Sequence, residues 1–520
     1  MITFFKKFFL SPVIWILLAS VLFMSPMLLY PTFNYIDDGQ TLLTGKTLLA
    51  TNDWSIWQKS LFEYENGRLR PAYQLYLLLM YLLFDVRPLG YWLSQTLVLA
   101  LTLLGLRALI KQLTQAKEWV IGLALTIFLL LPATIENLYR LGTAEPRQTL
   151  FLVWFLVWLS KLNLKRFNWQ SLALGNILLL LALATKETSV LVWPMIAIFF
   201  VWQWWQRSLK IKAVWPYGVS LLGLPLLFLF LLPSGQGYTA SVDFSFSKLW
   251  YGVLVTRFNW AEYYFPMVVA LIALLLRIIY SLKRGKLVVF LKTLQWPFML
   301  LTGFVGSLFF VFSWEHQLER YHYLTFVFML LFLFVEGSHY RFSQKTVKYF
   351  NQKIPTVYAI AFIILVMAAG FFMFRARYLL RKNLIERTVL GFQLMFYPHQ
   401  SAGSLTHYLY DSLPEGTQVY VDSDDYETVV GLGYFITRLG ERSAWVYSGN
   451  KDAAINYSPV HRYSTDVFAD YRQAPAPRLL VVADRHRVYF KKHELQLLAP
   501  KFIHDAHQYV YWYWRVKADF

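Results

Sequence analysis

Long apolar runs recur along this chain, and they constrain its fold more than any other feature. A spanning helix needs about 20 apolar residues, with a range of roughly 17–25. The stretch 71–106 is also apolar, but Asp85 and Pro88 interrupt it, so it predicts either one crossing with an interfacial helix or two short crossings. The clear runs, which predict an α-helical polytopic membrane protein, begin near Phe8, Trp119, Gln148, Trp169, Ser189, Val214, Ala261, Leu294, Tyr321 and Ile354.

The composition agrees with a chain whose solvent is largely lipid. Hydrophobic residues make up 57% of the chain and charged residues 15%, whereas soluble domains carry about 25% charged residues. Absence of cysteine excludes disulfides, a thiolate nucleophile and cysteine-ligated metals. The first apolar run, from Phe8 to Phe33, is too long for a signal peptide and has no small-residue cleavage site, so we expect an uncleaved first helix.

The distribution of charge predicts the orientation in the membrane. With one crossing at 71–106 there are about eleven crossings. One set of loops then holds 20 Lys and Arg and a single acid, Glu118, and comprises 1–7, 107–118, 160–170, 203–213, 277–293 and 337–353. The other set holds 10 Lys and Arg and 11 acids, and comprises 31–70, 134–147, 185–188, 234–260 and 313–320. Basic loops stay in the cytoplasm, so the first set is predicted to lie inside and the second set outside. The net charge of +19 is located mainly in these short loops, and it therefore indicates membrane topology and not a nucleic-acid partner.

The composition changes after about residue 375, which divides the chain into a membrane domain (1–375) and a polar C-terminal segment (376–520). That segment has strand-like runs with a helical pattern (426–440) between the first two, which predicts a small extracytoplasmic α/β domain. No glycine-rich phosphate loop follows the first run, so no nucleotide site is predicted. The strand-like runs are 417–424, 443–448, 478–484 and 508–516.

The long first outer loop, 31–70, carries an adjacent acidic pair, Asp37 and Asp38, just after the first apolar run. A carboxylate at this depth is a candidate general base for an acceptor hydroxyl. The second carboxylate would orient the acceptor or hold a divalent cation. The alternative is a solvated Asp-Asp-Gly turn. Two short helices on the membrane surface are expected further along the loop, at 41–50 and 55–62.

Further charged residues collect at the predicted outer ends of the apolar runs. Arg68 and Arg70 precede the second run, where guanidinium groups either bind a lipid-linked phosphate or extend to lipid headgroups. Lys186 and Glu187 form a hairpin so tight that both lie near the membrane boundary. They either pair with each other or bind phosphate and sugar. The loop before the run at Gln148 adds Glu145 and Arg147 as candidate binding residues.

The last outer loop, 313–320, adds Arg320 and the adjoining Tyr321 as candidates for binding a phosphate or pyrophosphate, and Glu315 as a further substrate-binding candidate. Histidines and acids occur together here, but their spacing matches no HExxH motif, so a metal site is a weak interpretation. The loop 234–260, which contains Arg257, is expected to cover the site as a lid.

Several short motifs together resemble the GT-C superfamily of membrane glycosyltransferases, especially the protein O-mannosyltransferase and aminoarabinose-transferase branch. They are the YIDDG segment (35–39), the GRLRPAY entry (67–73), the LFDVRPLG break (83–90), the Thr-Lys-Glu turn, and the polar segment after the last run. The resemblance covers about the first 330 residues. The acidic pair departs from the pattern, because many relatives have Asp-Glu where this chain has Asp-Asp.

The resemblance implies an inverting transfer from a polyprenyl-phosphate sugar to an envelope acceptor, which is a glycan, lipid or protein. Asp37 or Asp38 would be the base. No cofactor would be required, with a divalent cation on the acidic pair as the alternative, and the location would be a bacterial cytoplasmic membrane. The phosphate would be bound by residues among Arg68, Arg70, Lys186, Arg257 and Arg320.

Three other functions stay open at the sequence level. A polysaccharide polymerase or ligase would share the substrate and location, but its main outer loop usually comes late in the chain. A transporter or flippase would show midplane charges and internal repeats, and neither is visible in the sequence. A non-catalytic scaffold would tolerate alanine at both Asp37 and Asp38.

Overall fold

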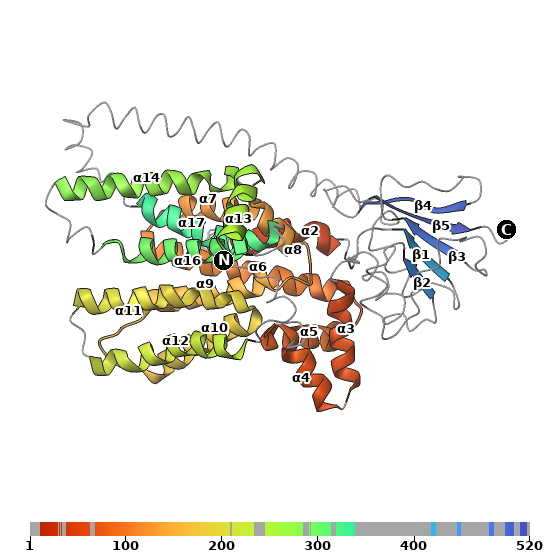
Figure 1. Ribbon diagram of the computed structural model, residues 1–520, viewed down its shortest axis with the longest axis horizontal. Helices are drawn as coiled ribbons and strands as arrows, with labels where there is room; N and C mark the ends of the chain where they lie inside the picture. Colours follow the sequence, from red (N-terminus) through yellow and green to blue (C-terminus); the bar gives the residue numbers. More distant parts are fainter. Residues whose placement is uncertain are drawn as a thin grey trace, which may run out of the picture.

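The protein is described by a computed structural model, drawn in Figure 1. It describes residues between Ser11 and Ser338 and five later strands. Single gaps fall at 30, 32, 52, 260 and 292. The longer stretches outside the description are 1–10, 34–37, 63–67, 208–210, 233–244, 284–290, 314–318, 339–417, 423–444, 449–477, 483–494, 504–509 and 517–520.

The part of the chain up to Ser338 is helical. Within the described residues, six helical spans are long and apolar enough to cross a membrane, and four apolar helices are shorter. This agrees with the predicted helical membrane protein. The elements are α2 (Pro12–Leu29), α3 (Asp38–Ala50), α4 (Trp54–Phe62), α5 (Pro71–Phe84), α6 (Pro88–Thr114), α7 (Glu118–Leu130), α8 (Pro132–Leu138), α9 (Glu145–Lys161), α10 (Trp169–Thr185), the 3-10 helix η2 (Glu187–Val192), α11 (Trp193–Arg207), α12 (Ile211–Leu231), α13 (Phe246–Asn259), α14 (Ala261–Lys283), α16 (Gln295–Ser313), the 3-10 helix η4 (Glu319–His322) and α17 (Tyr323–Ser338).

The long helices lie side by side as a bundle, whereas α3 runs across one end of it (Figure 1). We call the end where Arg70, Glu145, Lys186 and Arg320 lie the rim end. Two contacts lie at the other end: Gln203 of α11 hydrogen-bonds Gln295 of α16, and Arg277 of α14 pairs with Glu336 of α17. We call this the opposite end. Gln203 and Arg277 come from loops predicted to lie inside, whereas Arg70, Glu145, Lys186 and Arg320 come from loops predicted to lie outside.

The interrupted apolar stretch 71–106 forms two helices of unequal length. Helix α5 has 14 residues, which is too short to span, whereas α6 has 27. Tyr76 in α5 hydrogen-bonds Ser94 in α6. Helices α5 and α6 therefore form a hairpin at the rim end, in which Ser94 lies beside Tyr76. From Ser94 onward, α6 continues alone to the opposite end. Only α6 of the two is long and apolar enough to cross a membrane, and the number of crossings in this stretch stays a prediction.

The apolar side chains divide between a packed interior and an outward surface. Trp92, Phe128 and Phe155 are buried between helices. Leu22, Leu82 and Phe230 are among many large apolar side chains that remain exposed. Such an extensive apolar surface is what a lipid environment solvates.

Five strands near the C-terminus form one mixed sheet with the order β2-β1-β3-β5-β4. Strand β1 pairs in parallel with β2 and β3, and β5 pairs antiparallel with β3 and β4. The sequence did not predict β4, and the helical pattern 426–440 and the domain boundary near 375 lie outside the described residues. The strands are β1 (Gln418–Asp422), β2 (Trp445–Ser448), β3 (Arg478–Val482), β4 (Leu495–Ile503) and β5 (Val510–Val516).

Candidate functional site

Four segments that are far apart in the sequence bring charged residues together at the rim end. Arg70 is the N-cap of α5, Glu145 is the first residue of α9, Lys186 joins α10 to η2, and Arg320 lies in η4. Prolines follow directly after Arg70 and Glu145, at a position where the fixed φ of proline favours the start of a helix. Arg70, Glu145 and Lys186 thus lie at the ends of apolar helices. We call these four residues, with Glu187 and Tyr321, the rim cluster.

Arg70 and Glu187 form a two-pronged ion pair across 117 positions of sequence. The guanidinium donates from Nε to one carboxylate oxygen at 2.7 Å and from Nη2 to the other at 2.5 Å. Both side chains are about nine-tenths buried. Parallel charge-assisted bonds of this kind fix geometry as well as supplying energy. This pair fastens the start of α5 to the junction of α10 and η2.

Lys186 and Glu145 form a second buried pair beside the first. The lysine ammonium donates to Oε1 of Glu145, and each side chain is about nine-tenths buried. The Tyr321 ring lies near two cations: Lys186 Nζ and Arg320 Cζ are each 5.3 Å from its centre. Arg320 also acts electrostatically on Glu145, and Arg68 acts on Glu187. Among the described side chains, the cluster and Arg68 thus set four cations against two carboxylates.

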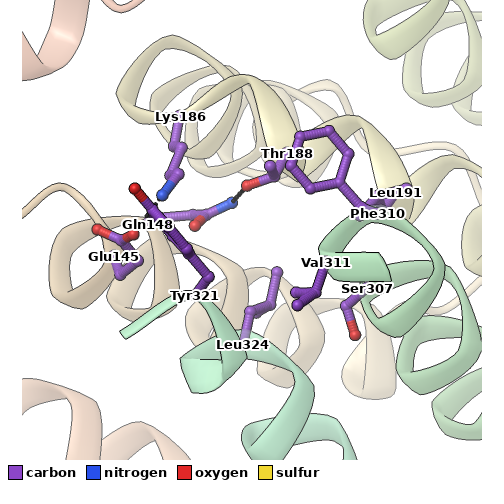
Figure 2. Close-up of a pocket in the computed structure, with 10 residues that line it drawn as sticks. All are labelled: Glu145, Gln148, Lys186, Thr188, Leu191, Ser307, Phe310, Val311, Tyr321 and Leu324. Carbon is purple, nitrogen blue, oxygen red and sulfur yellow. Dashed lines mark hydrogen bonds and ion pairs between the residues drawn. The ribbon is translucent and has the colours of Figure 1, made fainter. Parts of the chain in front are cut away.

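A pocket opens beside the second pair (Figure 2). Glu145, Lys186, Gln148 and Tyr321 lie at one end of it. The rest of the wall is mostly apolar and comes from η2, α16 and α17, through Leu191, Phe310, Val311 and Leu324, with Thr188 and Ser307. The pocket therefore has charged and polar side chains at one end and mostly apolar side chains along the rest of its wall.

Hydrogen bonds from buried polar residues hold the cluster in place. Asn137 in α8 donates to the Arg320 carbonyl at 2.9 Å, which positions η4. Tyr73 in α5 donates to the Gly142 carbonyl at 2.7 Å. Gln148 donates to the hydroxyls of Thr188 and Ser189. Sequence reasoning missed Gln148, Asn137 and Thr188, because an isolated amide or hydroxyl at the end of an apolar run carries no signal by itself.

Arg147, a predicted binding residue, makes contacts that connect helices. Its Nη1 donates to the Thr143 carbonyl, and its Nη2 donates to Tyr76 and to Gln95. The guanidinium also lies over the Tyr76 ring, 3.9 Å from its centre. These contacts fasten α9 to α5 and α6. A direct contact of Arg147 with substrate stays a prediction.

The predicted acidic pair is only partly described. Asp37 lies outside the described residues, and Asp38 begins α3, with its side chain not described. Helix α3 packs closely against α5, where a Cβ on Gly45 would lie 2.3 Å from Cβ of Tyr81. Since α5 starts at Arg70 of the cluster, this packing brings α3 to the same end of the bundle. The expected helices at 41–50 and 55–62 correspond to α3 and α4.

Three other expectations concern the last outer loops. Glu315 lies outside the described residues, and Arg257 lies in α13 with its side chain not described. Helix α13 packs on the rim-end part of α16, where a Cβ on Gly252 would come within 2.8 Å of the Phe312 backbone. Phe310 and Val311 of the pocket wall are neighbours of Phe312 in α16. Within the described residues, no group of three or more His, Asp or Glu is placed to hold a metal.

The chain resembles a solved structure but matches no family model and no curated sequence. No protein-family model matches the chain. No curated protein sequence matches it either. The crystal structure of ArnT from Cupriavidus metallidurans in the apo state is similar, with 13% sequence identity and a TM-score of 0.49 over 97% of this chain and 98% of that chain.

Proposed function

We propose that this protein is a GT-C type membrane glycosyltransferase that transfers a sugar from a polyprenyl-phosphate carrier to an envelope acceptor. The observation that supports this most is the rim cluster beside a pocket with apolar walls. A polyprenyl tail stays in lipid, so its phosphate reaches only the end of the helices. That depth is where Arg70, Lys186 and Arg320 lie.

The proposed reaction is one displacement with inversion. The acceptor hydroxyl attacks the anomeric carbon, its proton passes to Asp37 or Asp38, and the bond from the anomeric carbon to the phosphate oxygen breaks. The electron pair leaves with polyprenyl phosphate. Lys186 and Arg320 stabilise the charge that develops on that phosphate, because positioned cations in a water-poor site favour the transition state.

The apolar wall is proposed to take the first isoprene units of the carrier. Leu191, Phe310 and Val311 supply that surface next to Lys186. No nucleotide takes part in this reaction, and we propose that it needs no cofactor, with a divalent cation on Asp37 and Asp38 as the alternative. We place the protein in a bacterial cytoplasmic membrane with the rim end outside.

The direct test incubates purified protein with a panel of radiolabelled polyprenyl-phosphate sugars and an envelope extract as acceptor. We expect one donor to release free polyprenyl phosphate, and Asp37→Asn or Asp38→Asn, whichever removes the base, to lower the release about 10²–10⁴-fold. The outcome against the proposal is that every donor stays intact. A solute crossing proteoliposomes in the same preparation would then identify a transporter.

The orientation has its own test, because the chain has no cysteine to interfere with labelling. Gln58 in α4, from the loop predicted to lie outside, and Asn163, from the opposite end, are both exposed. With a membrane-impermeant maleimide on intact cells, we expect Gln58→Cys to react and Asn163→Cys to react only after lysis. The reverse pattern would place the rim end in the cytoplasm.

A further inference from the structure

We infer that the Thr188 hydroxyl donates a hydrogen bond to a phosphate oxygen of the lipid ligand, and that Gln148 holds the hydroxyl in this direction. The inference rests on the proposed function, which brings a polyprenyl phosphate to the pocket. Thr188 is then a phosphate-binding residue beside Lys186, and Gln148 is a positioning residue. Thr188 belongs to η2 and Gln148 to α9, and both line the pocket.

A chain of hydrogen bonds that leads to Thr188 begins at the carbonyl of Ala182. The Ser189 hydroxyl donates to this carbonyl oxygen at 2.8 Å. A carbonyl oxygen only accepts, and a serine has one hydroxyl proton, so the proton of Ser189 is directed at Ala182. The Ser189 oxygen therefore accepts from Gln148, whose Nε2 lies 2.9 Å away. The backbone carbonyl thus fixes which side of the Gln148 amide faces the hydroxyls.

Gln148 in turn fixes the direction of the Thr188 hydroxyl. The amide nitrogen carries two protons, and it donates to Thr188 Oγ1 at 2.8 Å as well as to Ser189. Figure 2 shows the Gln148 nitrogen and the Thr188 oxygen meeting at the pocket. The oxygen of Thr188 accepts on this side, so its own proton points away from Gln148. Within the described part of the chain that proton has no acceptor, which leaves it for a ligand.

The other aliphatic hydroxyl that lines the described pocket is placed differently. Ser307 Oγ donates to the Phe304 carbonyl of its own helix at 2.9 Å. Its proton is therefore used, and its oxygen is left as an acceptor. The charged oxygens of a phosphate carry lone pairs and bind donors, and such charge-assisted hydrogen bonds are short and strong. We therefore assign the donated bond to Thr188 and not to Ser307.

The positions of Lys186 and Leu191 indicate the class of ligand. The Lys186 ammonium lies in the same pocket and attracts an anion. Side chains at i and i+3 of a 3-10 helix lie on the same side, so Leu191 follows Thr188 along η2 and begins the apolar wall. Ammonium, hydroxyl and apolar wall thus come in the order in which a lipid phosphate presents its charge and its hydrocarbon.

The experiment measures the affinity of purified full-length protein for farnesyl phosphate by calorimetry. Thr188→Val removes the hydroxyl and keeps the shape, so we expect the affinity to fall about 10- to 100-fold, because a hydrogen bond to a charged group is lost. Thr188→Ser keeps the donor and should bind within about threefold of wild type. The matched control is Thr126→Val, at an exposed position of α7 where the hydroxyl donates to the Gly122 carbonyl, and it should leave the affinity unchanged.

A double-mutant cycle tests the role of Gln148. Gln148→Met removes the amide, and we expect an affinity about 3- to 10-fold lower than that of wild type. If Gln148 acts through Thr188, this loss disappears in the Thr188→Val background, whereas additive losses would overturn the positioning role. If Gln148→Met does not fold, the comparison of Thr188→Val with wild type still decides.

Thr188→Val protein that binds farnesyl phosphate as tightly as wild type overturns the inference. Inorganic phosphate tests the source of the phosphate, and we expect it to bind wild-type protein at least about tenfold more weakly, because it lacks the apolar tail. Equal binding of the two ligands, or failure of wild-type protein to bind farnesyl phosphate, contradicts the proposed function instead.

Discussion

The two ends of the helical bundle both hold buried charge, but they hold it differently. At the opposite end Arg277 and Glu336 pair at 3.0 Å between α14 and α17, one cation to one carboxylate. At the rim end two such pairs are described, Arg70 with Glu187 and Lys186 with Glu145, and the second lines a pocket. Burial of charge therefore does not by itself identify a site. A buried ion pair that lines a pocket is the better candidate, because a ligand can reach it.

The largest expected loss of activity follows from substitution of the acidic pair, Asp37 and Asp38, at the rim end. Asp37→Asn is expected to lower transfer about 10²–10⁴-fold, the usual contribution of a general base. The measurement is the initial rate of polyprenyl phosphate release from the donor identified above. Asp38→Asn is the matched variant, and the one with the larger loss is the base. Full activity in both variants would remove the base from the mechanism.

Lys186→Gln tests the cation at the pocket. We expect a fall of about 10²–10³-fold in kcat, because a positioned charge that stabilises the leaving phosphate is lost. Arg277→Gln is the control from the opposite end. It should lower stability and leave the rate per folded molecule unchanged. An equal loss of rate in the two variants would mean that the ends do not differ in function.

The buried ion pairs give a prediction about stability. Glu187→Gln and Glu336→Gln each remove a carboxylate that pairs with a buried arginine. Removing one member of a buried pair costs about 3–5 kcal/mol. We expect both to lower the thermal unfolding temperature in detergent, measured by intrinsic tryptophan fluorescence. An unchanged temperature for Glu187→Gln would show that the Arg70 pair does not fasten α5.

The smallest effect is expected at Glu118. This carboxylate accepts hydrogen bonds from Arg107 and Lys111 at the opposite end, and its side chain is 42% exposed. Exposed ion pairs contribute about 0–1 kcal/mol. Glu118→Gln should therefore leave both the unfolding temperature and the transfer rate close to those of wild type. A loss as large as that of Glu336→Gln would contradict the contrast between exposed and buried pairs.

The sequence by itself determined the helical membrane class, because apolar runs of spanning length have no other stable fold in lipid. It also predicted the charged residues at the rim end, since charge is costly within a membrane and collects where apolar runs end. Its interpretation of 71–106 left two alternatives. The hydrogen bond from Tyr76 to Ser94 favours one of them.

Only the tertiary structure decided which charges meet. Lys186 pairs with Glu145, not with its neighbour Glu187, and Glu187 pairs with Arg70. Adjacent residues at a helix junction point in different directions, so their sequence positions do not reveal their partners. Arg147, which looked like a binding residue, contacts α5 and α6. The pairing of these charged residues depends on how helices from distant parts of the chain pack against each other. A local sequence pattern does not predict that packing.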